Sequence, residues 1–226
     1  PKHLPPHVHS DQLSFELYYH GRHVISEVGT SVYEYGPERL YERSGAAHNV
    51  LQIGKTSASG EIEWIEPVEI WGNFRAGRKA QPKKRRCGQL PQGICFAEGD
   101  HDGYEQHGAS HHRRIELSPG PSHENMRLTL ADTLKTKKEF AFRIWWHIDP
   151  QIRDIFIERL QLDASTADSI TSSWEKTWFS IGLGKRICRF SYCIEGILAP
   201  GNHHLQSKLD MPNHLHEQNN ITNNVK

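Results

Sequence analysis

Hydrophobic and polar residues alternate most clearly near the start of the chain, at residues 12–19. Every second residue there is apolar, at Leu13, Phe15, Leu17 and Tyr19. Successive side chains of a strand point to opposite faces, so this pattern predicts a half-buried strand. The turn sequence His20-Gly21-Arg22 and a short apolar stretch follow it. Residues 12–27 therefore predict a β-hairpin.

Further short stretches of β-branched and aromatic residues occur along the chain, and Gly, Pro, Asn and Asp separate most of them. Many short strands with turn residues between them are typical of an all-β protein, and we expect an antiparallel multi-stranded β-sandwich. The predicted strands are residues 49–53, 61–65, 67–71, 94–98, 112–117, 126–130, 139–147, 178–181 and 185–194.

The remaining segments carry weaker patterns. Residues 151–162 predict a short helix next to Pro150, and the basic run at residues 83–86 predicts a solvated loop. We expect one sandwich domain over residues 1–199, incomplete at its N-terminus because the chain opens with Pro1. Residues 200–226 are polar and rich in asparagine, which predicts a disordered tail.

Composition narrows the classes of function. The 226 residues hold 27 Lys and Arg against 27 Asp and Glu, so no overall field favours nucleic acid or an anionic membrane. No run of about 18 apolar residues predicts a membrane-spanning helix. The four cysteines lack the spacing of a zinc site. Free thiols are the simpler interpretation, and a disulfide requires an oxidising compartment.

Sixteen histidines are many for this length, and several of them cluster. The group at the C-terminal end, from His203 to His216, is interpreted as a surface excess. The densest group is His7-Val8-His9-Ser10-Asp11, in which two imidazoles project from one face of an extended segment. Such a pair is often no more than two surface histidines. Glu27 and His48 lie beside predicted strands and could converge on it, giving a plausible zinc set.

An H-x-H-x-D-x-L-S-F-E-L sequence begins at His7, and an R-S-x-A-A-H-N block ends at Asn49. With these two motifs, residues 7–53 resemble the C-terminal β-sandwich domain of heparinase II/III-type polysaccharide lyases. Later pieces support it: Trp71-Gly72-Asn73-Phe74, the H-D-G-Y sequence at 101–104, and the H-R-R sequence at 112–114. The similarity covers about residues 5–150.

The resemblance implies roles for individual residues. His7 matches an active-site histidine, and Tyr35 matches an active-site tyrosine, with Tyr33 as the competing assignment. His9, Glu27 and His48 match the ligands of a metal, usually zinc. Glutamate at position 27 departs from the aspartate that the family usually carries.

The resemblance also implies a reaction and a location. Members cleave uronic-acid polysaccharides, of the heparin, heparan sulfate or alginate type, by β-elimination. A base removes the proton on C5, and the leaving oxygen on C4 is protonated. The metal is expected to hold the histidines in place rather than to activate water. The family implies an acidic polysaccharide as the partner, and the periplasm or cell envelope as the compartment.

The family's N-terminal helical toroid, which supplies much of the cleft, is absent from this sequence. We therefore expect this chain alone to be inactive, and to self-associate or to pair with a missing toroid domain. Two other functions are open. A metal-dependent cupin-like barrel would use Glu16 in place of Glu27. A non-catalytic carbohydrate-binding sandwich would use some of the six tryptophans.

Overall fold

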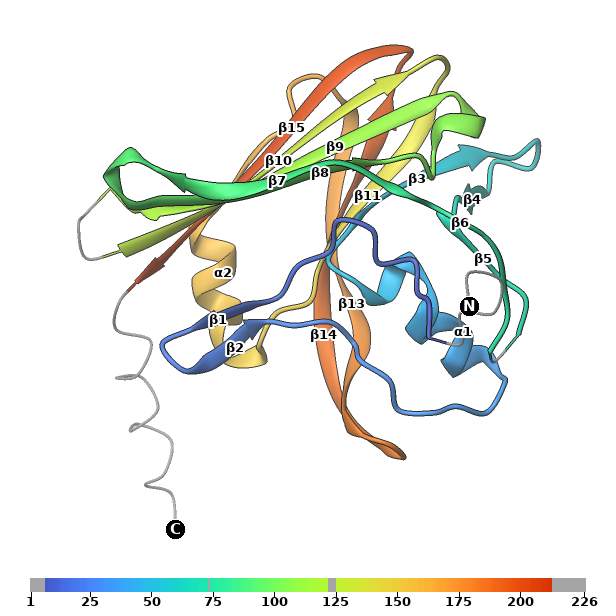
Figure 1. Cartoon of the computed structure of the whole chain (residues 1–226), viewed down its shortest axis with the longest axis horizontal. Helices are drawn as coiled ribbons and strands as arrows, with labels where there is room; N and C mark the ends of the chain where they lie inside the picture. Colours follow the sequence, from blue (N-terminus) through green and yellow to red (C-terminus); the bar gives the residue numbers. More distant parts are fainter. Residues whose placement is uncertain (1–6, 73, 122–124, 213–226) are drawn as a thin grey trace.

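Two antiparallel sheets form the two layers of the molecule, one crossing over the other (Figure 1). The structure is a computed structural model that describes residues 7–72, 74–121 and 125–212. The all-β antiparallel sandwich expected from the alternation pattern is confirmed, and the described residues hold no helical toroid.

The larger sheet has six strands in the order β12-β15-β10-β9-β8-β7. Consecutive strands β7 to β10 form a meander, and β15 returns from the end of the chain to pair with β10 along its whole length. Its strands are β7 (Pro82–Leu90), β8 (Ile94–His101), β9 (Ala109–Pro119), β10 (Asn125–Thr136), β12 (Leu160–Asp163) and β15 (Gly201–Pro212).

The smaller sheet has five strands in the order β13-β14-β11-β3-β4. Its central strand β11 is buried at nearly every residue, because one face meets the other sheet and the opposite face is covered by loops and side chains. Its strands are β3 (Leu51–Thr56), β4 (Ile62–Trp64), β11 (Phe140–Trp146), β13 (Asp168–Gly182) and β14 (Lys185–Leu198).

The core between the sheets combines alternating residues of both layers. Phe142, Ile144 and Trp146 of β11 meet leucines of β10 and β15. Burying each such side chain contributes about 1.5–3 kcal/mol. Helix α2 (Arg153–Arg159), which starts after a 3₁₀ turn at Pro150–Ile152, packs Phe156 against Trp146 at a ring separation of 5.4 Å. The helix predicted for residues 151–162 is confirmed over its centre.

Smaller elements lie along one side of the sandwich (Figure 1). They are the hairpin β1 (Leu17–Tyr19) with β2 (Arg22–Ile25), the hairpin β5 (Val68–Ile70) with β6 (Ala76–Lys79), and helix α1 (Pro37–Arg43). Helix α1 was missed because it is short. Its start nonetheless follows local rules, with a proline in the first turn followed by Glu38. Three further 3₁₀ turns occur at Gly45–Ala47, Pro91–Gly93 and Glu105–His107.

The first hairpin is shorter than its alternation suggested. Leu17 and Tyr19 are buried and Tyr18 is exposed, as predicted, but the strand begins only at Leu17. Before it, Leu13 takes a left-handed conformation with φ of 62°, and Ser14 N donates a hydrogen bond to Asp11 O. A turn therefore replaces the predicted first half of the strand. That turn carries Ser14 toward Glu27.

The predicted disordered tail is wrong for residues 201–212, which form β15. Its buried residues alternate, and the apolar ones are Leu205, Leu209 and Met211. Polar residues between them lower the mean hydropathy and hide this period of two. His203 on this strand is also buried, which corrects its interpretation as a surface residue. Residues 213–226, including His214 and His216, lie outside the described residues.

The basic run at residues 83–86 is part of β7 rather than a loop. Its side chains are exposed, and several of them pair with carboxylates nearby: Lys83 with Glu105 and Arg86 with Glu98. Charged side chains on an edge strand also discourage pairing with another chain.

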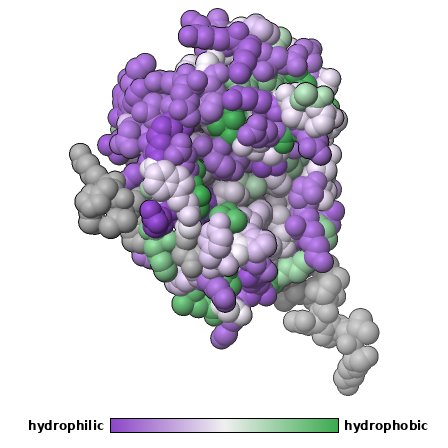
Figure 2. Space-filling model, turned by 90° about the vertical axis from the view of Figure 1, so that its right-hand side faces the viewer, coloured by the Kyte–Doolittle hydropathy of each residue, from purple (hydrophilic) through white to green (hydrophobic). Residues whose placement is uncertain are grey.

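The surface is unevenly polar. The face at the right-hand side of Figure 1 is hydrophilic over most of its upper part, with hydrophobic residues gathered lower down (Figure 2). Within the part of the chain that the structure describes, no helix is long and apolar enough to cross a membrane.

Candidate functional site

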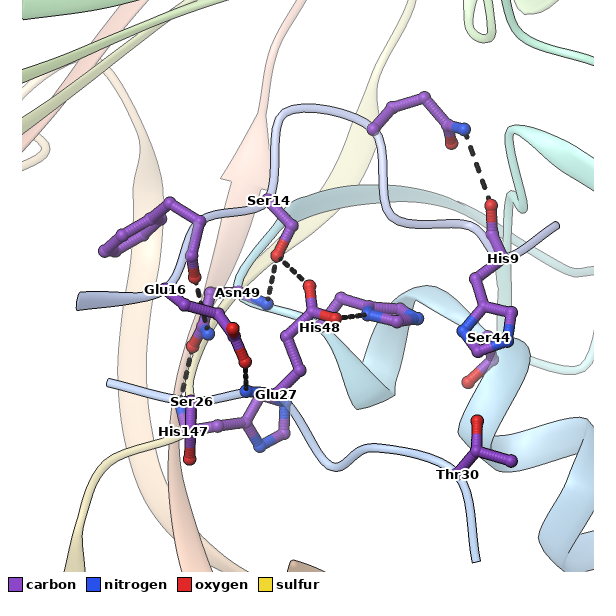
Figure 3. Close-up of polar contacts among 12 residues, drawn as sticks. His9, Ser14, Glu16, Ser26, Glu27, Thr30, Ser44, His48, Asn49 and His147 are labelled. Carbon is purple, nitrogen blue, oxygen red and sulfur yellow. Dashed lines mark hydrogen bonds and ion pairs between the residues drawn. The ribbon is translucent and has the colours of Figure 1, made fainter. Parts of the chain in front are cut away.

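Three side chains from separate segments meet beside the five-stranded sheet (Figure 3). His9 comes from the first described segment, Glu27 from the stretch after β2, and His48 from the stretch between the 3₁₀ turn Gly45–Ala47 and β3. His48 Nδ1 lies 2.9 Å from Glu27 Oε2. The rings of His9 and His48 have centroids 5.2 Å apart. The structure therefore brings these three residues into one region.

His48 is the most enclosed member of this group, at 2% exposure. Its Nδ1 faces the Glu27 carboxylate, and its Nε2 is buried without a hydrogen-bond partner among the described residues. A buried ring nitrogen that carries a lone pair and has no donor opposite it is costly. The same nitrogen is well suited to bind a cation.

His9 stays neutral at ordinary pH. Burial, together with the nearby His48, Arg39 and Arg43, lowers its pKa to about 3, and Glu27 only partly opposes them. A neutral imidazole is the form that binds metals. Arg43 also fixes the position of the segment around His9, because its Nε donates to Val8 O at 3.0 Å and its carbonyl oxygen accepts from Ser10 N at 2.9 Å.

Glu27 is held in its charged form. Burial opposes ionisation, but contacts with His48 and with the Ser14 hydroxyl outweigh it and lower the pKa of Glu27. Ser14 Oγ donates to Glu27 Oε1 at 2.6 Å, and Glu16 Oε1 accepts from the Glu27 backbone N–H at 3.1 Å. The contact with His48 belongs to Glu27 rather than Glu16, which disfavours the cupin-like ligand set.

Asn49, next to His48, joins the segments that carry the site (Figure 3). It is fully buried. Its backbone N–H donates to Ser14 Oγ at 3.0 Å, and its side chain donates to Phe15 O at 3.0 Å. The side-chain oxygen accepts from His147 N at 2.7 Å. Asn49, which directly follows His48, thus links the turn before β1 to the end of β11.

A buried charged network extends from Asn49 into the six-stranded sheet. Arg113 on β9 donates to Asn49 O at 2.7 Å and to Leu13 O at 3.1 Å. Its guanidinium also makes a two-pronged ion pair with Asp132 on β10, at 2.7 and 2.9 Å. The Arg113 charge holds the pKa of the Asp132 carboxyl well below its usual range against the effect of burial.

Two histidines complete this network. His111 Nε2 lies 2.6 Å from Asp132 Oδ1, and His101 Nε2 lies 3.3 Å from His111 Nδ1. Gly103 N donates to His101 Nδ1 at 3.1 Å, so the proton of a neutral His101 sits on Nε2 and points toward His111. The H-D-G-Y and H-R-R sequences therefore build the support beneath the site. His112 itself faces Asp100.

This network predicts loss of stability in mild acid. Burial, His111 and Arg113 lower the pKa of His101 to about 3, whereas the unfolded chain protonates this ring near 6.5. The contribution of neutral His101 is therefore complete above pH 6.5 and is lost as the pH falls toward 3. Between pH 6.5 and 5 the loss is about 2 kcal/mol.

Urea unfolding of the wild type and of His101→Asn at pH 7 and pH 5 measures this loss. We expect a smaller drop in unfolding free energy between the two pH values for the variant. His204→Asn, at an exposed position on β15, controls for the loss of an imidazole. Equal drops in the wild type and in His101→Asn would contradict the assignment.

His7 and a tyrosine lie at the exposed side of this group. The His7 ring stands edge-on to Tyr33, with centroids 6.1 Å apart, and edge-on to Phe74 at 6.5 Å. The Tyr33 and Phe74 rings stack on each other at 6.0 Å, so the three rings form one cluster. Tyr33 is 39% exposed and Tyr35 is 57% exposed. The structure brings Tyr33 into ring contact with His7. No such contact of Tyr35 occurs among the described residues.

The imidazole groups of His9 and His48 are ligands of a kind that divalent cations accept. Two imidazoles on one tetrahedral zinc place their ring centres about 5 Å apart, which is the observed separation of His9 and His48. The His48 Nε2 without a partner provides a free ligand atom. However, no three His, Cys, Asp or Glu side chains among the described residues are already arranged around one ion position, because Glu27 faces His48 Nδ1.

Several residues of the site region were not predicted from the sequence. Asn49 belongs to the R-S-x-A-A-H-N block and Arg113 to the H-R-R sequence, and these motifs were the signal in the sequence that could have identified the two residues. Arg43 also stood within a quoted motif, as the first residue of the R-S-x-A-A-H-N block, whereas Arg39 carried no signal in the sequence. Both are buried beside His9, where their charge acts on its pKa.

Comparisons with known proteins point to one family. The family model described as "Heparinase II/III-like, C-terminal" matches residues 1–203. The crystal structure of the heparan sulfate lyase HepC from Pedobacter heparinus is similar, with a TM-score of 0.61 and 16% identity over 92% of this chain and 32% of that one. A crystal structure of heparinase III gives a TM-score of 0.61 and 17% identity over 90% and 30%.

The chain spans about a third of the length of the solved structures that it matches. At these identities the structural likeness shows the fold. No curated protein matches the sequence.

Proposed function

The chain belongs to the heparinase II/III-like C-terminal family, and from this premise we propose that it is the β-sandwich part of a polysaccharide lyase that acts on uronic-acid glycans by β-elimination. The observation that carries the proposal is the meeting of His9, His48 and Glu27, from three segments far apart in sequence, next to an exposed His7.

His7 is the proton-transfer residue of the proposed site. It is exposed, and Tyr33 stands beside it, so either group could take the C5 proton or protonate the C4 oxygen as the C4–O bond breaks. Tyr35 as the active-site tyrosine stays a prediction, and the geometry favours Tyr33. Glycans of the heparin, heparan sulfate or alginate type are the proposed substrates.

His9 and His48 would hold a divalent cation, for which zinc suits the donors. When bound, the cation would link the two imidazoles and fix the segment that carries His7. Glu27 as a direct ligand stays a prediction. Its contact with His48 Nδ1 supports a different role, in which the carboxylate orients a metal-binding histidine.

Zinc titration of the purified chain tests the metal proposal. We expect one zinc ion per chain for the wild type, and no zinc at this site for His9→Ala and His48→Ala. Glu27→Ala should weaken binding by about 10–100-fold if the carboxylate orients His48. His7→Ala is the matched control and should keep the metal. A wild type that takes up no zinc would contradict the proposed site.

Ultraviolet absorbance of unsaturated uronate tests the reaction, with heparan sulfate, heparin and alginate as substrates. We propose that elimination requires groups outside this chain, since related structures are about three times longer. The chain alone should then give no absorbance signal. Lyase activity of the chain alone would contradict the proposal that elimination requires groups outside it. A periplasmic or cell-envelope location is likewise proposed from the family.

A non-catalytic carbohydrate-binding sandwich is the second candidate. Trp71 favours it, because its ring is 62% exposed, whereas Trp145 and Trp146 are buried in the core. Glycan binding that survives His9→Ala and His48→Ala but is lost in Trp71→Ala would support this function over the lyase.

A further inference from the structure

A small pocket of about 230 Å³ lies between the first hairpin and the long hairpin formed by β13 and β14. Its lining comes from β2 and the residue after it, from the segment before α2, and from the facing strands β13 and β14. The lining residues are His23, Ser26, Asp149, Pro150, Phe179, Ile187 and Arg189.

Arg189 is a buried cation at this pocket. Its side chain is 3% exposed, and it makes no ion pair with a carboxylate among the described residues. It donates only to the hydroxyl and carbonyl oxygens of Ser26, at 2.7 and 3.1 Å, and its Nε has no partner. A guanidinium has five N–H groups, so most of its donors are unused. A buried charge without a counter-ion is expensive to maintain.

Asp149, the other charged group of the lining, limits the charge of a suitable ligand. Its carboxylate already has partners, because its Oδ2 lies 2.7 Å from Arg22 and its Oδ1 accepts from Gln151 N. Its negative charge still lies at the pocket, which disfavours a dianion such as phosphate. Arg189 without a counter-ion, beside a carboxylate that already pairs with Arg22, fits a ligand with a single negative charge, and carboxylates match the planar donors of arginine.

The walls set the shape of the ligand. Phe179 and Ile187 form a cross-strand pair, and Ile187 is 51% exposed. The Phe179 ring also lies 5.4 Å from the Arg189 guanidinium carbon. An apolar wall next to a cation, with His23 and Ser26 opposite, suits a ring that has a C–H face, hydroxyl groups and one carboxylate.

We propose that this pocket binds a single uronic acid residue, with its carboxylate on Arg189 and its ring against Phe179. The choice of a sugar ring rests on the proposed function, whereas the choice of a carboxylate rests on Arg189. The pocket is separate from the proposed metal site, because none of His9, Glu27 and His48 lines it. It would therefore add a second contact for an acidic glycan.

Glucuronate, glucose and benzoate are the probes, and binding is followed by calorimetry on protein kept free of metal. We expect glucuronate to bind and glucose to bind at least about 10-fold more weakly, since it lacks the group that pairs with Arg189. Arg189→Gln should weaken glucuronate binding by a similar factor. Ile187→Glu tests the same contact from the exposed rim, where folding is not at risk, by placing a competing carboxylate near Arg189.

Ile181→Glu is the matched control, because Ile181 is 56% exposed on the same hairpin but outside the pocket. It should bind glucuronate as the wild type does. Equal binding of glucose and glucuronate, binding of benzoate alone, or unchanged glucuronate binding in Ile187→Glu would each overturn the proposal. Because this binding test uses metal-free protein, its outcome is independent of the lyase proposal. The lyase proposal is tested separately, by zinc uptake and by elimination.

Discussion

Replacement of Arg113 by methionine is expected to lower the free energy of unfolding by about 3–5 kcal/mol. The substitution leaves the Asp132 carboxylate buried and without its positive partner, which Arg113 contacts at 2.7 and 2.9 Å. It also removes the donor to Leu13 O and Asn49 O, which lie beside the proposed site. We therefore expect weaker zinc binding as well as lower stability. Urea denaturation and zinc titration measure the two effects.

Arg127 provides the matched control on the neighbouring strand β10. It makes a similar two-pronged pair with Asp210, with both distances at 2.7 Å, but both side chains are partly exposed. Solvent screens such a pair, so Arg127→Met should cost only about 0–1 kcal/mol. If both variants lose the same stability, burial of the Arg113 pair is not what stabilises this part of the sandwich.

Replacement of Asn49 by alanine is expected to cost about 2–5 kcal/mol, because it leaves Phe15 O and His147 N buried without their partners. These two hydrogen bonds connect Asn49, the residue after His48, to the segments that carry Phe15 and His147. The orientation of His48 should therefore loosen, and zinc affinity should fall by at least about 10-fold. Thermal unfolding without metal reports the first effect, and zinc titration reports the second.

Asn202→Ala is the control for this substitution, since Asn202 is exposed on β15. It should change stability by less than about 0.5 kcal/mol. Asn49→Asp keeps the acceptor for His147 N but loses the donor to Phe15 O, and so should lie between the wild type and Asn49→Ala. Normal zinc affinity in a folded Asn49→Ala protein would show that Asn49 does not position His48.

The candidate site was predictable in its donors but not in its arrangement. His9, Glu27 and His48 could be chosen because imidazole and carboxylate groups near strand ends are chemically suited to a metal. That Glu27 faces His48 Nδ1, and that His48 Nε2 lacks a partner, depends on side-chain directions set by Ser14 and Asn49. Arg189 carried no motif at all, since its burial follows only from packing against Ser26 and Phe179.

The sequence by itself determined several local elements, as at Leu17 and Tyr19, where one face of a strand is apolar. The period of two is a local property that neighbouring residues share. It also determined which chemistry the N-terminal segment can offer. Tertiary structure alone decided that 201–212 is a strand and that Arg113 reaches Asn49, 64 residues away in sequence. Such contacts depend on which strands pair and in which register, and that is settled by the burial of the whole sandwich rather than by any one segment.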